Sequence, residues 1–173
     1  SPAAFGGIAV AVGPAWGFTV LAFGETRGEA TDGRFRVPMS NESARARAVL
    51  WCRQARADGR AASVLAQAQE WSHSCFQAQQ AAEKALKALL ADRDQDLRSH
   101  SLAALLRELG GDAPQRWSQQ ARLLDKLYAP TRYPDALGEM APMDVFGAED
   151  AAAAMQAASQ LLDWVETELG IES

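Results

Sequence analysis

Four side chains in the second half of the chain have the chemistry to bind an anion: Arg98, His100, Arg132 and Tyr133. Arg98 and His100 stand where a helix is expected to begin, and backbone N–H groups at a helix start favour negative charge. Arg132 and Tyr133 stand in a later, proline-flanked loop. There a guanidinium supplies a planar fork for phosphate, and a tyrosine ring supplies a stacking face for a base. These residues predict a nucleotide or another anion held by side chains.

Two interpretations of the later loop stay open. In the first, the loop binds an anion, and Asp135 either joins that site or holds Arg132 in place. In the second, Arg132, Asp135 and the two prolines only fix the loop against the rest of the fold. The sequence contains no Gly-x-x-x-x-Gly-Lys-Ser/Thr segment, which excludes the phosphate-cradling loop of many nucleotide-binding proteins.

The soft metal ligands are few: two cysteines, Cys52 and Cys75, and two histidines, His73 and His100. No pair of them has the spacing of a zinc site, and the sequence has no Cys-x-x-Cys. We therefore expect no metal and no cofactor. The thiols are expected to be reduced and to pack as small hydrophobic side chains in a cytoplasmic protein.

The charge of the chain is unevenly placed. The 173 residues carry a net charge of −5, and 48% of them are hydrophobic, which suits one globular domain. Residues 111–173 hold eleven acidic and four basic residues, so a chain-wide nucleic-acid-binding surface is disfavoured. A local basic row remains, and it is either a solvated face or a surface for an anion or RNA: Arg45, Arg53, Arg56 and Arg60.

The first 40 residues differ from the rest. Residues 1–24 carry no charge and contain two β-rich runs, 8–12 and 18–23, and a third run lies at 33–37. We expect a strand-like extension in residues 1–40. Disorder and a membrane or targeting element are the alternatives, but a Gly-Pro pair interrupts the apolar run and argues against a membrane span.

From Asn41 onward the hydrophobic spacing is helical. In the first long helix, the inner face is predicted from residues that recur at intervals of three, four or seven: Ala46, Leu50, Ala57, Ala61, Val64 and Ala68. The second helix has its own predicted inner face: Cys75, Ala78, Ala82, Leu86 and Leu89.

Five helices are expected in all, near 41–68, 71–91, 99–109, 117–128 and 149–169. The fold is therefore predicted to be all-α. We expect an up-and-down bundle of four to five helices in residues 41–173, preceded by a short β-like or irregular N-terminal extension in residues 1–40.

Two segments, CFQAQQAAEKALKALL at 75–90 and YAPTRYPDAL at 128–137, carry a family resemblance. A Trp-x-x-Gln-Ala start at 51–55 and the Arg-Ser-His-Ser-Leu at 98–102 accompany them. Together they resemble the HEPN family, the "higher eukaryotes and prokaryotes nucleotide-binding" domain, over residues 44–169. The resemblance implies a helical bundle that commonly dimerises.

The activities that the resemblance implies range from nucleotide binding to RNA cleavage, often beside a minimal nucleotidyltransferase partner. A related domain closes the chaperone-like protein sacsin. Catalytic HEPN proteins carry an arginine followed by a histidine after four to six residues. Arg93 and His100 meet that spacing, with six residues between them, but they straddle an Asp-rich connector rather than one late helix.

These observations favour a non-catalytic, homodimeric HEPN module without membrane attachment, and a minimal nucleotidyltransferase or a chaperone is its expected partner. It is expected to bind a nucleotide (ATP or GTP) or another polyanion through Arg98, His100, Arg132, Tyr133 and Asp135. The alternative is a metal-independent endoribonuclease that uses Arg93 and His100 and is restrained, as a toxin, by a nucleotidyltransferase. In such an enzyme the pair would orient the scissile phosphate and move protons during attack by the ribose 2′-OH.

Overall fold

The computed structural model of the chain describes residues 11–12, 18–19 and 41–171. The chain divides into two units, Ser1–Arg36 and Val37–Ser173, which are described separately. In the first unit, strands β1 (Ala11–Val12) and β2 (Phe18–Thr19) pair antiparallel. The rest of the expected N-terminal extension, with its third run, lies outside the described residues.

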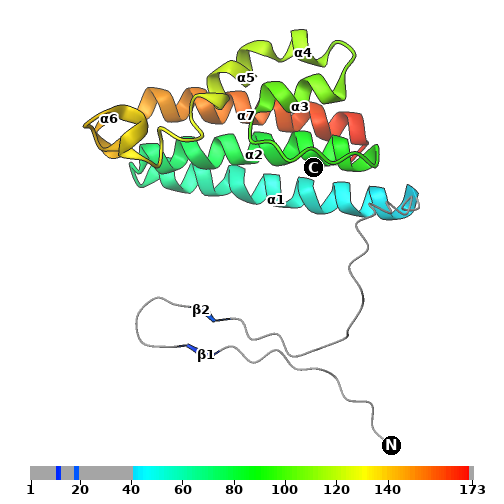
Figure 1. Cartoon of the computed structure of the whole chain (residues 1–173), viewed down its shortest axis with the longest axis horizontal. Coiled ribbons are helices and arrows are strands. Elements are labelled where there is room, and N and C mark those ends of the chain that lie inside the picture. Colours follow the sequence, from blue (N-terminus) through cyan, green and yellow to red (C-terminus); the bar gives the residue numbers. More distant parts are fainter. Residues whose placement is uncertain (1–10, 13–17, 20–40, 172–173) are drawn as a thin grey trace, which may run out of the picture. The chain divides into compact units, whose positions relative to one another are not determined.

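The second unit is helical, and the predicted all-α class is confirmed (Figure 1). Five of its described helices have eight residues or more, and the others are single turns. Their bounds are α1 (Asn41–Gln67), α2 (Trp71–Asp92), α3 (Leu102–Leu109), α4 (Ala113–Arg116), α5 (Ser118–Asp125), η1 (Pro134–Leu137), α6 (Pro142–Val145) and α7 (Ala148–Leu169). None of the described helices has both the length and the apolar character that a membrane crossing requires.

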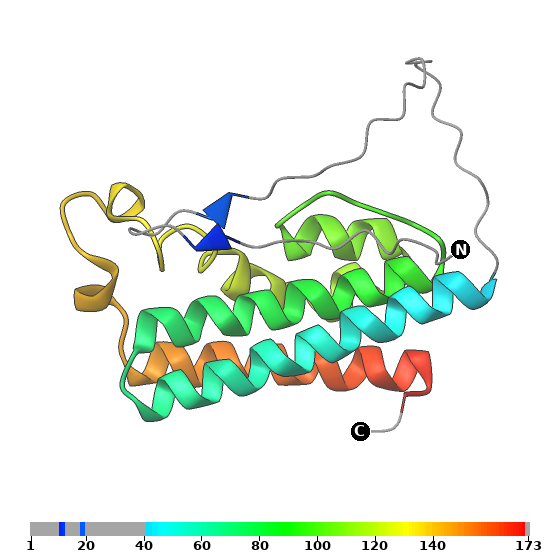
Figure 2. The ribbon, with the colours of Figure 1, turned by 90° about the horizontal axis from the view of Figure 1, so that it is seen from below.

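Helix α2 is the centre of this bundle. It packs along α1 and α7, and the shorter α3 and α5 also contact it (Figures 1 and 2). Its predicted inner face is confirmed, since all five residues of that face are buried. Small alanines alternate with leucines such as Leu86 and Leu90, so the neighbouring helices approach closely on more than one side of α2.

The predicted inner face of α1 is wrong. Leu50 and Val64 are 60% and 64% exposed, whereas the buried face consists of small residues: Ala44, Ala48, Cys52, Ala55 and Ala62. Alanine occurs on several faces of α1, so spacing alone gives two competing stripes. The all-small stripe is buried because it lets the backbones of α1 and α2 come close, and the larger Leu50 and Val64 are left outside.

The predicted basic row on α1 is divided between two environments. Arg45 donates to the carbonyl of Leu169 and lies 3.4 Å from Asp92, and Arg56 forms an ion pair with Glu166. These arginines therefore fasten α1 to its neighbours. Arg53 and Arg60 are exposed.

Both cysteines are buried, and burial raises the pKa of Cys52 to about 11 and of Cys75 to about 12. The thiolate is the reactive form, so native protein at pH 8 is expected to resist a thiol-exchange reagent. The absorbance of the product released from the reagent should be negligible in buffer and should correspond to two reacted thiols per chain in urea. Rapid reaction of the folded chain would contradict this burial.

Candidate anion-binding site

Three segments place side chains at one surface of the bundle. One face of α2 contributes Phe76 and Glu83. His100 lies two positions before α3, and the turns after α5 contribute Tyr128 and Arg132. Helix α5 ends at Asp125, earlier than predicted, and turns follow it. A proline restricts the residue before it to extended conformations, which explains why the helix does not run on into this proline-containing segment.

The guanidinium of Arg132 lies among three aromatic rings. Its carbon is 4.4 Å from the ring centres of Phe76 and Tyr128 and 4.8 Å from that of Tyr133. Its Nε donates to the carbonyl of Tyr128 at 2.9 Å. Within the described residues, the two terminal nitrogens of Arg132 make no hydrogen bond or ion pair. The aromatic faces favour a cation, so they fix the fork in place and leave its outer donors for a ligand.

His100 adjoins this cluster through Tyr128. The two rings stack at 4.5 Å with an interplanar angle of 16°, and His100 Nδ1 is 3.2 Å from a carboxylate oxygen of Glu83. An ionised carboxylate at this distance favours a proton on Nδ1, so Nε2 is the ring nitrogen that is left for a ligand. The side chain of His100 is 60% exposed, so a ligand can reach it.

Glu83 is a buried carboxylate with a complete set of donors. It accepts from Lys87 at 2.9 Å, from Gln79 at 3.2 Å and from Gln80 at 3.3 Å, besides its contact with His100. Burial acts to raise the pKa of Glu83, but hydrogen bonding and charge from Lys87, with help from Gln79 and His100, outweigh burial and lower it. Because Lys87 forms an ion pair with Glu83, the charge of Glu83 is balanced without Arg132.

The structure brings together three of the five predicted anion-binding residues: His100, Arg132 and Tyr133. Tyr133 is 54% exposed beside the Arg132 guanidinium. Arg98 is exposed, and its side chain forms no hydrogen bond or ion pair with the other candidates in the described part of the chain. Asp135 is exposed on η1, and Arg132 is held by Tyr128 and the rings instead of by Asp135.

The start of α3 does not offer the free N–H groups expected from the sequence. Ser101 caps the helix, and the carboxylate of Asp125 accepts from Leu102 N at 2.6 Å and Ala103 N at 3.2 Å. An anion at this helix start would have to displace Asp125. The candidate site is therefore built from side chains.

The residues of the ribonuclease alternative are not brought together. Arg93 donates to the carbonyl of Leu109 at 2.7 Å, at the C-terminal end of α3. His100 precedes the N-terminal end of the same helix. Arg93 thus donates to a carbonyl that has no partner within the last turn of α3, and His100 faces Glu83 and Tyr128.

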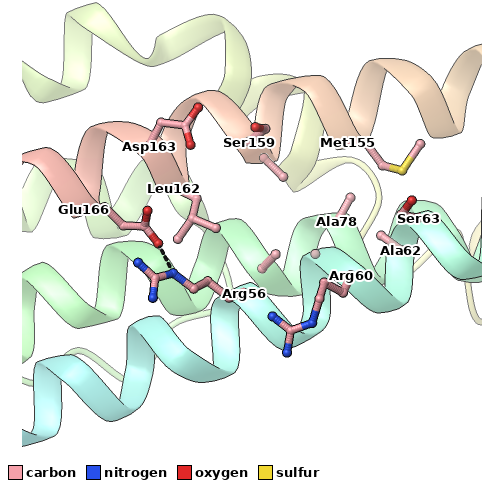
Figure 3. A pocket seen from close by; sticks show the side chains of 13 residues that line it. Arg56, Arg60, Ala62, Ser63, Ala78, Met155, Ser159, Leu162, Asp163 and Glu166 are labelled. Carbon is pink, nitrogen blue, oxygen red and sulfur yellow. Dashed lines mark hydrogen bonds and ion pairs between the residues drawn. The ribbon is translucent and has the colours of Figure 1, made fainter. Parts of the chain in front are cut away.

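A groove of about 480 Å³ lies between α1 and α7, and its floor is formed by α2 (Figure 3). Ala78 and Ala81 of α2 line it. The candidate anion site, called the anion cluster below, consists of Phe76, Glu83, His100, Tyr128, Arg132 and Tyr133. Its two α2 residues, Phe76 and Glu83, lie on the opposite face of that helix from Ala78 and Ala81. The anion cluster and the groove are thus separate sites. Among the described residues, no group of three or more His, Cys, Asp or Glu is placed to hold a metal ion.

A family model of the HEPN domain matches residues 48–168. Two solved structures are similar to this chain. The crystal structure of TT1696 from Thermus thermophilus is 38% identical, with a TM-score of 0.68 over 70% of this chain and 98% of that one. The crystal structure of ST0689, an archaeal HEPN homologue, is 35% identical, with a TM-score of 0.62 over 71% of this chain and 98% of that one. No curated protein matches the chain.

Proposed function

The chain belongs to the HEPN domain family, and on that premise we propose that it is a non-catalytic, dimerising module that binds a nucleotide through Arg132, His100 and Tyr133. In this proposal the guanidinium of Arg132 takes two phosphate oxygens. In its protonated form His100 adds a second donor through Nε2–H, and the exposed ring of Tyr133 stacks on the base. A minimal nucleotidyltransferase or a chaperone remains the partner that this proposal foresees.

The observation that carries the proposal is the immobilised guanidinium. When a surface arginine binds a ligand, its side chain normally loses conformational entropy, and the full loss costs about 2 kcal/mol. Here the stacking on Phe76, Tyr128 and Tyr133 and the bond to the Tyr128 carbonyl have already fixed the Arg132 side chain. A ligand therefore meets a preorganised fork, and preorganisation raises affinity by reducing the cost of ordering.

Replacing Arg132 by alanine is expected to weaken ATP or GTP binding by about ten-fold or more, because a charge-assisted contact contributes roughly 1.5–3 kcal/mol. Arg132→Lys should fall between the parent and Arg132→Ala, since lysine keeps the charge but loses the fork. Titration of a fluorescent ATP analogue measures both changes. The matched control is Arg122→Ala, at an exposed arginine of α5, which should leave affinity unchanged.

Two outcomes would overturn the proposal. The first is unchanged nucleotide affinity in a folded Arg132→Ala variant, as verified by circular dichroism. The second is RNA cleavage by the purified chain that both Arg93→Ala and His100→Ala abolish, which would establish the endoribonuclease instead. Within the proposal, His100→Ala should also weaken nucleotide binding, because it removes the imidazole that stacks on Tyr128 next to the Arg132 guanidinium.

A further inference from the structure

We propose that the groove between α1 and α7 receives the exposed ridge of α1 from a second copy of this chain, with Arg60 of each copy pairing with Asp163 of the other. This inference rests on the dimeric part of the proposed function and names the surface that forms the dimer. Four observations carry it: the floor of the groove, an open glycine, the shape of α1 and the charges on the rim.

The floor of the groove is apolar and made of small side chains. Ala78 and Ala81 of α2 form it, and Ala62 of α1 and Ala158 of α7 line the groove beside them. All four are buried, so the groove is shaped by missing side-chain volume. Met155 and Leu162 of α7 form its wall and are only partly buried. Apolar surface of this kind gains free energy when another apolar surface covers it.

Gly59 keeps the groove open although α1 itself does not require a glycine there. A Cβ built at Gly59 would meet nothing within 4 Å, and its backbone is not in the left-handed region. A glycine inside a helix lowers stability relative to alanine, so the helix gains nothing from it. The vacant space at Gly59 lets another backbone approach α1 closely.

The outer ridge of α1 has the shape to fill this space in a second copy. Leu50, Ala57 and Val64 are spaced by seven residues, which places them on one face of a helix that packs against another. Leu50 and Val64 are the strongly exposed apolar residues of this ridge. Arg60 follows Ala57 by three residues and precedes Val64 by four, so it shares their face.

The charges on the rim are self-complementary. Arg56 reaches across the groove to Glu166 and is satisfied within one chain, whereas Arg60 on α1 and Asp163 on α7 are exposed and form no ion pair within residues 41–171 (Figure 3). A two-fold axis that brings the ridge of one copy into the groove of the other presents Arg60 to the partner's Asp163. The same axis makes the reciprocal pair. A second copy of the chain therefore offers an oppositely charged partner to each of these two rim residues.

Charge inversion tests this interface. Light scattering of the full chain should give about twice the 18.6 kDa chain mass. Arg60→Asp or Asp163→Arg alone places like charges opposite each other at both symmetry-related pairs, and the dimer should dissociate about 100-fold more readily. The double variant R60D/D163R restores both pairs with exchanged signs and should regain the parent's dimer affinity.

Two further variants separate the interface from the fold. Arg122→Asp inverts an exposed charge on α5 away from the groove and should leave the dimer unchanged. Gly59→Leu fills the groove mouth and should give a monomer that keeps its circular dichroism spectrum. ATP titration should be unaffected in every groove variant, since the anion cluster lies on the other face of α2.

The results that would overturn the inference are distinct from those that would overturn the proposed function. A dimeric parent whose mass is indifferent to both single inversions, or not restored in the double variant, places the interface elsewhere and leaves the nucleotide-binding module standing. A parent that is monomeric at 100 µM, the concentration chosen for the test, overturns this inference and the dimeric part of the proposed function together.

Discussion

Replacing Glu83 by glutamine is expected to lower the free energy of unfolding at pH 7 by about 3 kcal/mol, because breaking one member of a buried ion pair leaves its partner uncompensated. Glu83 is only 3% exposed, and Lys87 and His100 direct their donors at it. Glutamine keeps the shape but presents an N–H₂ group toward those donors. Urea unfolding followed by fluorescence of the five tryptophans measures the loss.

The loss should depend on pH in a defined direction. The pKa of Glu83 is lowered below its ordinary 4.5 in the folded chain, so its carboxylate stabilises the fold above that pH. This stabilisation disappears as the pH falls through the lowered pKa. The difference between parent and Glu83→Gln should therefore be full at pH 7 and shrink progressively at pH values below 4.5.

The control for Glu83 is Glu139, an exposed carboxylate in the loop between η1 and α6. Glu139→Gln should change stability by less than about 0.5 kcal/mol at either pH, as surface substitutions usually do. A loss below about 1 kcal/mol in Glu83→Gln would show that the carboxylate network is not a determinant of the fold.

The fold could be predicted from the sequence wherever large apolar residues mark one face of a helix. In α2 the predicted stripe contains the leucines Leu86 and Leu89, and every predicted inner residue is buried. In α1 alanine lies on several faces, and the two large residues, Leu50 and Val64, misled the prediction. Close packing of α1 against α2 depends on the small size of the buried side chains. The spacing of hydrophobic residues does not distinguish small side chains from large ones.

The candidate site could be predicted only in part from the sequence. His100, Arg132 and Tyr133 could be chosen by chemistry alone, and the structure places them in one cluster. Tyr128, which joins them, stands four residues before Arg132, and that helical spacing was the available signal. Glu83 was not among the predicted site residues. Its contact with His100 spans 17 residues of sequence, and no local pattern reveals it.

Helix α3 positions one side of the site, and its start depends on a residue from another element. Asp125, the last residue of α5, accepts hydrogen bonds from Ser101 Oγ at 2.9 Å and from the N–H groups of Leu102 and Ala103. A carboxylate at a helix N-terminus satisfies donors that have no partner within the helix and interacts favourably with the helix dipole. Asp125 therefore holds the segment that carries His100.

Asp125→Ala is accordingly expected to lower the free energy of unfolding by about 2 kcal/mol, at the upper end of measured capping losses, because three donors lose their acceptor at once. Asp125→Asn keeps an acceptor oxygen without the charge and should lose about half as much. Asp135→Ala, at an exposed aspartate of η1, is the control and should leave stability within about 0.5 kcal/mol of the parent. If Asp125→Ala unfolds at the same urea concentration as Asp135→Ala, solvent replaces the carboxylate without loss. The anchoring of His100 would then have to come from Glu83 and Tyr128 alone.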